Sequence, residues 1–159
     1  MSVDLAFRQA NAAMRAGDFA EAERQYLALV DEKPLWALHN LGALYVAAGR
    51  FADGEAAFRQ ALEVDPAAPL PRHALGMLLM AAGRYAEGWP LMEARRDIPG
   101  MKIPSPAVAC PEWRGEDLAG KRLLVWFEQG LGDQIQFFRF LLALKDAGAR
   151  VTLLCDPSL

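Results

Sequence analysis

Apolar residues recur three or four positions apart on both sides of Gly49, a spacing typical of two amphipathic helices. The stripes are formed by Leu38, Leu41 and Tyr45 before this glycine and by Phe51, Phe58, Ala61 and Leu62 after it. Gly49 can adopt the left-handed conformation that ends a helix, and Pro66 cannot continue one. Gly42 and Gly54 leave room for a close approach. The pattern therefore predicts two antiparallel helices within residues 35–68, which need neighbouring helices to bury their apolar stripes.

The segment around Gly49 has two related copies in the chain. VAAGRFADGE at 46–55 matches MRAGDFAEAE at 14–23 and MAAGRYAEGW at 80–89, so that Gly17 and Gly83 correspond to Gly49. A period near 34 residues is typical of helix–turn–helix repeats. The sequence predicts three such repeats, at about 3–34, 35–68 and 69–97, with Pro34 and Pro66 closing the first two. In the third repeat, Trp89 and Pro90 predict a second helix that begins late or bends.

The middle repeat resembles the tetratricopeptide repeat (TPR) family at the positions of Leu41, Gly42, Tyr45, Gly49, Phe51, Phe58, Ala61 and Pro66. This resemblance implies a mainly α fold, a TPR-type solenoid of three repeats over residues 1–97. It also implies a concave groove that binds a protein or peptide partner. The residues expected to face that groove are Phe7, Asn11, Met14, Trp36, His39, Asn40, Ala43, Val46, Leu70, His73, Met77 and Met80.

The chemistry of these groove positions narrows the kind of ligand. Most are apolar, and flexible methionines suit adaptable packing against a partner. His39 and His73 occupy equivalent positions, but no Cys, Asp or Glu joins them, so no metal site is predicted. Asn11 and Asn40 stand without a groove lysine, which argues against a clamp for a C-terminal carboxylate. An alternative remains open, in which later residues of the chain itself fill the groove.

The repeat pattern gives way to a Pro- and Gly-rich linker at 98–118 and then to a different alternation. KRLLVWFE at 121–128 and ARVTLLCD at 149–156 read as buried parallel strands, with a helix predicted over 134–148. Residues 119–159 therefore predict a short Rossmann-like βαβ segment, in which Asp133 caps the helix together with Gln136. The glycine-rich turn lacks the third glycine of a dinucleotide site and the Lys-Ser/Thr of a phosphate loop, so no cofactor is expected.

A second resemblance joins the two halves of the chain. Residues Trp113, Gly115, Leu118, Gly120 and Lys121, then Glu128 to Asp133, Ile135, Gln136, Phe137 and Arg139, resemble bacterial TPR–glycosyltransferase fusion proteins. Their enzyme part is heptosyltransferase-like, of the two-Rossmann-domain type. The resemblance implies that Asp133 is a candidate general base and that Gln129, Gly130, Leu131 and Gly132 form an anion or substrate loop. The alternatives are thus a protein-interaction module, or an N-terminal fragment of such an enzyme that is inactive without its sugar-nucleotide domain.

Composition and charge restrict the partners further. The formal net charge is −3, the pI is near 5.4, and no Lys/Arg cluster is present, so neither nucleic acid nor an anionic membrane is expected as a partner. The N-terminus does not read as a signal peptide. Cys110 and Cys155 lack metal-ligand spacing and are expected to be buried reduced thiols of a cytoplasmic protein. The open strand edge of residues 119–159 is expected either to pack on the last repeat or to mediate self-association.

Overall fold

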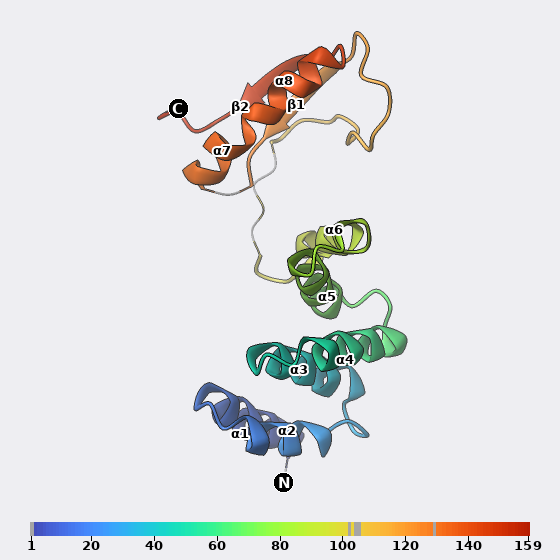
Figure 1. The fold of residues 1–159 in the computed structure, drawn as a ribbon, viewed down its shortest axis with the longest axis vertical. Coiled ribbons are helices and arrows are strands. Elements are labelled where there is room, and N and C mark those ends of the chain that lie inside the picture. Colours follow the sequence, from blue (N-terminus) through green and yellow to red (C-terminus); the bar gives the residue numbers. More distant parts are fainter. Residues whose placement is uncertain (1, 102, 104–105, 129) are drawn as a thin grey trace. The chain divides into compact units, whose positions relative to one another are not determined.

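A computed structural model describes residues 2–101, 103, 106–128 and 130–159. The chain separates into two compact units, Met1–Met101 and Lys102–Leu159. The first unit is helical and the second contains a small parallel sheet (Figure 1). The predicted fold class, a mainly α helix–turn–helix solenoid followed by a short βαβ segment, is confirmed.

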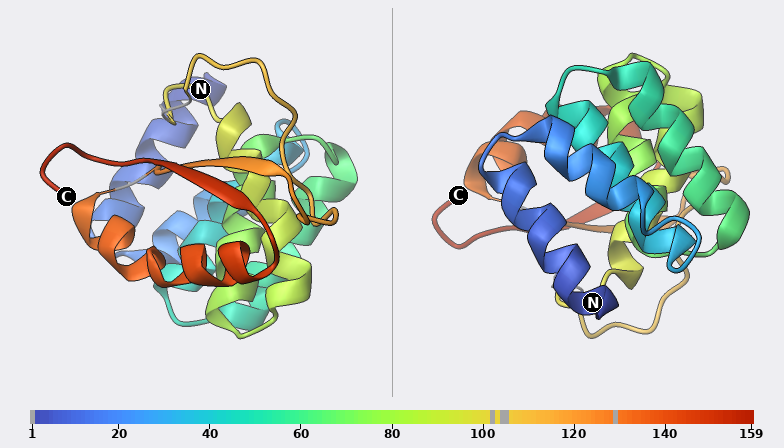
Figure 2. Two further views of the ribbon diagram at one scale, coloured as in Figure 1. Left: turned by 90° about the horizontal axis from the view of Figure 1, so that it is seen from above. Right: turned by 90° about the horizontal axis from the view of Figure 1, so that it is seen from below.

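Helices of the first unit form three antiparallel pairs. They are α1 (Val3–Arg15) with α2 (Phe19–Leu27), α3 (Pro34–Ala47) with α4 (Phe51–Val64), and α5 (Pro69–Ala81) with α6 (Tyr85–Met92). Each pair contacts the next through α2 with α3 and α4 with α5, and the helices of a pair run side by side (Figure 2). This stacking buries the apolar stripes that a single pair would leave exposed.

The helix ends follow the glycines and prolines of the repeat. Gly17, Gly49 and Gly83 have φ values of 80°, 77° and 77°, a conformation that glycine adopts at low cost after a helix. Pro34 does not close the first repeat as expected, because it is the first residue of α3. Proline fits this position because its fixed φ suits a helix and its missing N–H would have no intrahelical partner there.

The second helix of the third repeat is shorter than its counterparts. The helix α6 has eight residues where α4 has fourteen, and a 3₁₀ segment, Glu93–Asp97, follows it directly. Of the two expected alternatives, a late start or a bend, the late start does not occur, because α6 begins at Tyr85. Pro90 lies inside it and cannot donate a backbone hydrogen bond, which accounts for the early change of helix type.

Small residues set the distance between the two helices of each repeat. A Cβ atom built on Gly42 of α3 would lie 2.5 Å from Phe58 of α4, and one on Gly54 would lie 3.2 Å from the Gly42 carbonyl oxygen. In the first repeat, the matching positions hold Ala10 and Ala22, both fully buried. The expected close approach at Gly42 and Gly54 is therefore present, and it leaves no space for a methyl group at Gly42.

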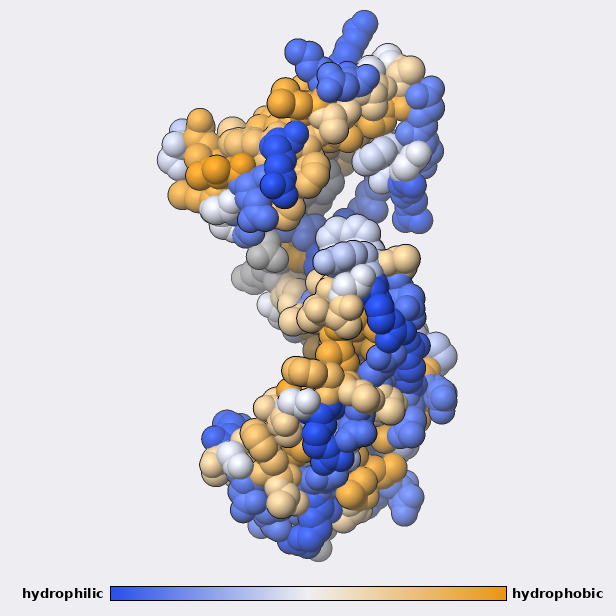
Figure 3. All heavy atoms as spheres, viewed as in Figure 1, coloured by the Kyte–Doolittle hydropathy of each residue, from blue (hydrophilic) through white to orange (hydrophobic). Residues whose placement is uncertain are grey.

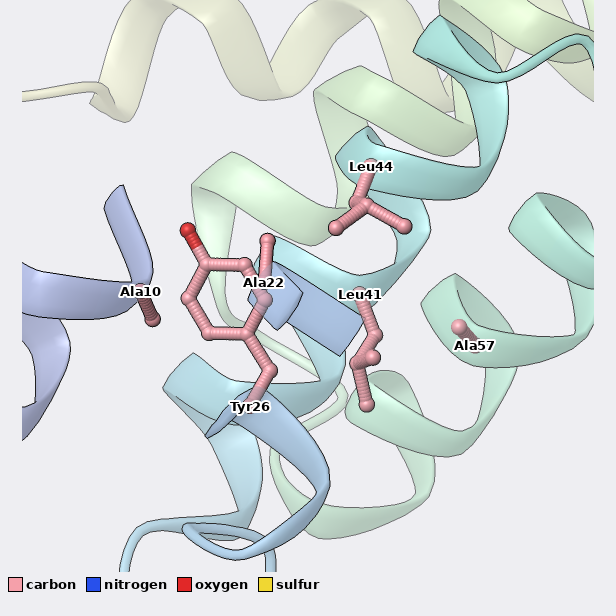
Figure 4. Packing of buried hydrophobic residues seen from close by; sticks show 6 residues of the cluster. All are labelled: Ala10, Ala22, Tyr26, Leu41, Leu44 and Ala57. Atoms are coloured by element: carbon pink, nitrogen blue, oxygen red, sulfur yellow. The ribbon is translucent and has the colours of Figure 1, made fainter. Parts of the chain in front are cut away.

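Tyr26 forms the centre of the first core cluster. Its ring is fully buried on α2, between Ala10 of α1 and Leu41 of α3 (Figure 4). A second cluster contains Phe58 with Leu75 and Leu79, and thereby joins α4 to α5. Both clusters span a boundary between repeats, so the repeats stabilise one another through side chains contributed by each.

Ion pairs connect successive repeats at matching positions. Arg50 at the start of α4 pairs with Glu23 of α2 at 3.0 Å, and Arg84 at the start of α6 pairs with Glu55 of α4 at 2.7 Å. We call these four residues the inter-repeat ladder. The series ends on both sides, because the position of the arginine holds Asp18 in the first repeat and that of the glutamate holds Trp89 in the third.

The second unit is a two-stranded parallel sheet with helices between the strands. Strand β1 (Arg122–Trp126) pairs in register with β2 (Arg150–Leu154), and α7 (Leu131–Phe137) and α8 (Arg139–Asp146) connect them. The predicted single helix over 134–148 thus begins three residues earlier and is interrupted at Phe138. Along β2, exposure alternates with residue number, as expected for a strand with α8 packed on one face.

The linker tryptophan makes a local contact, and the expectation for the cysteines needs correction. Trp113 is 46% exposed, and its Nε1 donates a hydrogen bond to the carbonyl oxygen of Glu116 at 2.8 Å. Both cysteines are free thiols. They are not buried as expected, because Cys110 is exposed and Cys155 is partly exposed.

Candidate functional site

A cavity of about 350 Å³ lies on the first unit between α1 and α3. Its lining combines residues from both helices with the residue that precedes α3: Val3, Asp4, Phe7, Asn11, Lys33, Trp36 and Asn40. Four of these, Phe7, Asn11, Trp36 and Asn40, are predicted groove residues. Trp36 is 49% exposed, so the indole offers a large apolar surface at this site. We call this cavity the α1–α3 groove.

The side-chain amide of Asn11 in the groove is oriented by a hydrogen bond from the core of the repeat unit. The hydroxyl of Tyr26, in the first core cluster, donates a hydrogen bond to Asn11 Oδ1 at 2.5 Å. Because the amide oxygen is thus engaged, the amide nitrogen of Asn11 remains as the donor group of this side chain. Burial raises the pKa of Tyr26, so the phenol keeps the proton that it donates.

Charged groups of the groove lie outside the predicted set. Asp4 and Lys33 line the cavity, whereas the sequence reasoning found no groove lysine. Lys33 precedes Pro34 in the connection between repeats, where the helix positions of the family give no signal for a groove residue. The groove therefore presents one carboxylate and one ammonium group beside Trp36, Asn11 and Asn40.

Several other predicted groove residues contact the interior of the repeats. Met14 packs against the first core cluster and Val46 against the second. Met80 lies so close to α6 that a Cβ on Gly88 would be 2.9 Å from its Cγ, and Val46 approaches Gly54 in the same way. These three side chains thus also pack between the two helices of a repeat, and their groove-facing role stays a prediction. Met77 is 54% exposed, and Leu70 is partly buried.

His39 and His73 are not arranged as a pair of metal ligands. The imidazole of His39 lies 5.8 Å from the ring of Phe58, and its Nδ1 is buried without a hydrogen-bond partner in the described part of the chain. Burial lowers the pKa of His39, and burial together with nearby Arg95 lowers that of His73. No group of three or more His, Cys, Asp or Glu side chains suited to a metal ion occurs among the described residues.

Acidification should destabilise the repeat unit through His39. Because the folded-state pKa of His39 lies below its ordinary value of about 6.5, the unfolded chain binds more protons as the pH falls through that region. We therefore expect a lower urea midpoint of unfolding at pH 5.5 than at pH 7.5. Carboxylates titrate below this pH range, so they do not account for the change. His39→Leu should show a smaller fall, and an equal fall in both proteins would contradict this role.

The second candidate site is the turn before α7. The helix begins earlier than expected: Gly130 is the N-cap residue, and Asp133 lies in the first turn without a side-chain capping bond. The prediction that Asp133 and Gln136 form a capping box is therefore wrong. Gly130, Leu131 and Gly132 are exposed, and Gln129 lies outside the described residues. The assignment of Asp133 as a general base, and of this turn as a substrate loop, stays a prediction.

Gln134 is a structural polar residue of this turn that sequence reasoning missed. It is 7% exposed, and its Oε1 accepts a hydrogen bond from the backbone N–H of Asp156 at 3.0 Å. This bond ties α7 to the segment after β2. A buried glutamine within a polar-rich sequence gives no signal that distinguishes it from exposed neighbours such as Gln136.

Across the described ranges, no helix has the length and apolar content of a membrane-spanning segment.

Matches to family models support the repeat assignment. Two family models described as "Tetratricopeptide repeat" match residues 7–43 and 35–68. Protein FlbA of Caulobacter vibrioides is 38% identical over an alignment of 64 residues, and the match covers 37% of this chain and 10% of FlbA. The chain thus spans about a tenth of the length of that relative. The structure of a MamA mutant has a TM-score of 0.49 at 18% identity, covering 60% of this chain and 71% of that one.

Proposed function

We propose that this chain, in which residues 7–68 consist of tetratricopeptide repeats, is a protein-interaction module that binds a peptide segment of a partner in the α1–α3 groove. The observation that carries the proposal is the convergence of Trp36, Phe7, Asn11 and Asn40 on one cavity. An exposed indole beside amide donors is a combination that protein interfaces favour, because it joins a large apolar contact to a few orienting hydrogen bonds.

The groove chemistry suggests how a peptide would be held. Trp36 would cover an apolar side chain of the partner, and the amide nitrogen of Asn11 would donate to a carbonyl of its backbone. Asp4 and Lys33 add one charge of each sign to the lining. They would discriminate between partners more than they would add affinity, since exposed charges are well solvated before binding.

Removal of the Trp36 indole should weaken binding about tenfold or more, as expected for a central aromatic contact. The probe is a peptide selected from a random displayed library on the immobilised full chain, with its dissociation constant measured by fluorescence anisotropy. Trp36→Ala is compared with Trp89→Ala, which removes an indole that is 65% exposed on α6 and outside the groove. Unchanged binding by Trp36→Ala would contradict the proposal, whereas loss in both variants would place the peptide elsewhere.

A further inference from the structure

The two walls of the α1–α3 groove carry the same order of side chains. On each wall a charged residue, an aromatic residue and an amide follow one another, spaced three and then four residues apart, as on one face of a helix. The two sets are Asp4, Phe7 and Asn11 on α1, and Lys33, Trp36 and Asn40 at the start of α3 and along it. Both helices run in the same direction, because each is the first helix of an antiparallel pair in the stack. The charges therefore lie at one end of the groove, the rings in the middle and the amides at the other end.

The charged end of the groove has no internal partner. Asp4 and Lys33 are exposed, and neither forms an ion pair with the other or with another residue in the described part of the chain. Figure 3 shows hydrophilic and apolar side chains interspersed over the first unit, so the groove does not belong to a wholly apolar surface. A ligand with one charge of each sign would satisfy both groups, whereas a purely acidic or basic ligand would be repelled by one of them.

The size of the cavity favours an extended ligand. One turn of an α-helix is about 10 Å wide and about 5.4 Å long, and so occupies roughly 420 Å³ or more. The cavity holds about 350 Å³, less than a single helical turn requires. In an extended segment successive side chains point to opposite sides, so that one residue faces α1 and the next faces α3.

We infer that the peptide proposed to bind this groove is an extended segment in which a basic and an acidic residue are adjacent and are followed or preceded by two apolar residues; the inference rests on that proposed function. The basic side chain pairs with Asp4 on one wall, and its acidic neighbour pairs with Lys33 on the other. The two apolar side chains then reach Phe7 and Trp36. The spacing fits, because two residues of an extended chain advance about 6.6 Å and three residues of a helix about 4.5 Å, a difference smaller than one side chain. Beyond them, the amide nitrogen of Asn11 donates to a backbone carbonyl of the segment.

An exchange of the two groove charges tests this assignment. A peptide is selected from a random displayed library on the immobilised full chain, and a second peptide is made with its basic and acidic residues exchanged. Both are measured by fluorescence anisotropy on the wild type and on the double variant Asp4→Lys with Lys33→Glu. We expect each matched combination to bind at least tenfold more tightly than each mismatched one, because two attractive pairs become two repulsive contacts.

A control variant exchanges two charges in the other unit. Lys145→Glu with Asp146→Lys alters exposed residues of α8 and leaves the net charge unchanged, so it should bind both peptides as the wild type does. Circular dichroism checks that both double variants are folded. An alanine inserted between the two charged residues of the peptide should weaken binding roughly threefold, the effect of one exposed ion pair, because both charges then face the same wall.

The outcomes separate this inference from the proposed function. Selected peptides that lack the adjacent charges, or equal affinities in all four combinations, would overturn the inference and leave peptide binding in the groove intact. Binding that survives Trp36→Ala, or the selection of no peptide at all, would contradict the proposed function and the inference with it. An alanine insertion without effect would overturn the extended arrangement.

Discussion

Replacing Phe58 with alanine will lower the free energy of unfolding of the repeat unit by about 4 kcal/mol, the range found for buried aromatic residues. Phe58 is 2% exposed and contacts both Leu75 and Leu79 across the boundary to the third repeat. Its loss would therefore leave a cavity between α4 and α5, which neighbouring helices can fill only partly. Urea denaturation followed by circular dichroism measures the effect.

Phe51→Ala provides a matched control on the same helix. Phe51 is 59% exposed, so its removal should cost less than about 1 kcal/mol. Similar losses in the two variants would show that Phe58 is not the side chain that joins the second and third repeats.

The second large effect is expected at Gly42, where alanine should destabilise the unit by about 2 kcal/mol. The new methyl group would lie 2.5 Å from Cδ1 and Cε1 of the Phe58 ring, well inside van der Waals contact. This overlap outweighs the roughly 1 kcal/mol that alanine gains over glycine in a helix. The ring must move or the two helices must separate, and the measurement is again the urea midpoint and slope.

A double-mutant cycle separates this steric effect from helix propensity. In the Phe58→Ala background, Gly42→Ala should cost nothing or become stabilising, because the ring that obstructs the methyl group is absent. If Gly42→Ala has the same cost in both backgrounds, the overlap with Phe58 is not the cause of the destabilisation.

Much of the first unit could be predicted from local patterns. Gly17, Gly49 and Gly83 indicate the helix ends because a positive φ after a helix is a local requirement of the backbone. Pro34 was assigned to the wrong side of a boundary, since proline both ends one segment and begins the next. The proline marks a boundary between two helices, but the sequence pattern does not determine whether it follows the first helix or begins the second.

The candidate groove was predictable only in part. Trp36 and Asn40 are implied by the resemblance to tetratricopeptide repeats, but Lys33 and Asp4 enter through tertiary placement of a connection and of the first turn of α1. Val46 was expected in the groove because its helix position is equivalent to groove positions in the family. In this chain Gly54 brings α4 so close to Val46 that this side chain also packs between the two helices. The distance between two packed helices depends on the residues of both helices, so the apolar pattern of one helix alone does not predict it.

The turn before α7 illustrates a competition between two local signals. Asp133 followed by Gln136 satisfies a capping-box pattern, yet the helix starts at Leu131 after the extended Gly130. An aspartate in the first turn is favourable in either arrangement, because it interacts with the helix dipole. The local pattern therefore predicts that a helix starts near this turn but not which residue is its first.

The inter-repeat ladder also carries directional information. Glu23 and Glu55 each point forward along the chain to an arginine, and Asp18 and Trp89 occupy the two positions where the series stops. Any shuffling of the three repeats would therefore bring a carboxylate or an indole to a place where a complementary charge is required. The inter-repeat ion pairs therefore form only when the repeats follow one another in their native order. The order of the repeats is thus specified by charged surface residues as well as by the apolar core.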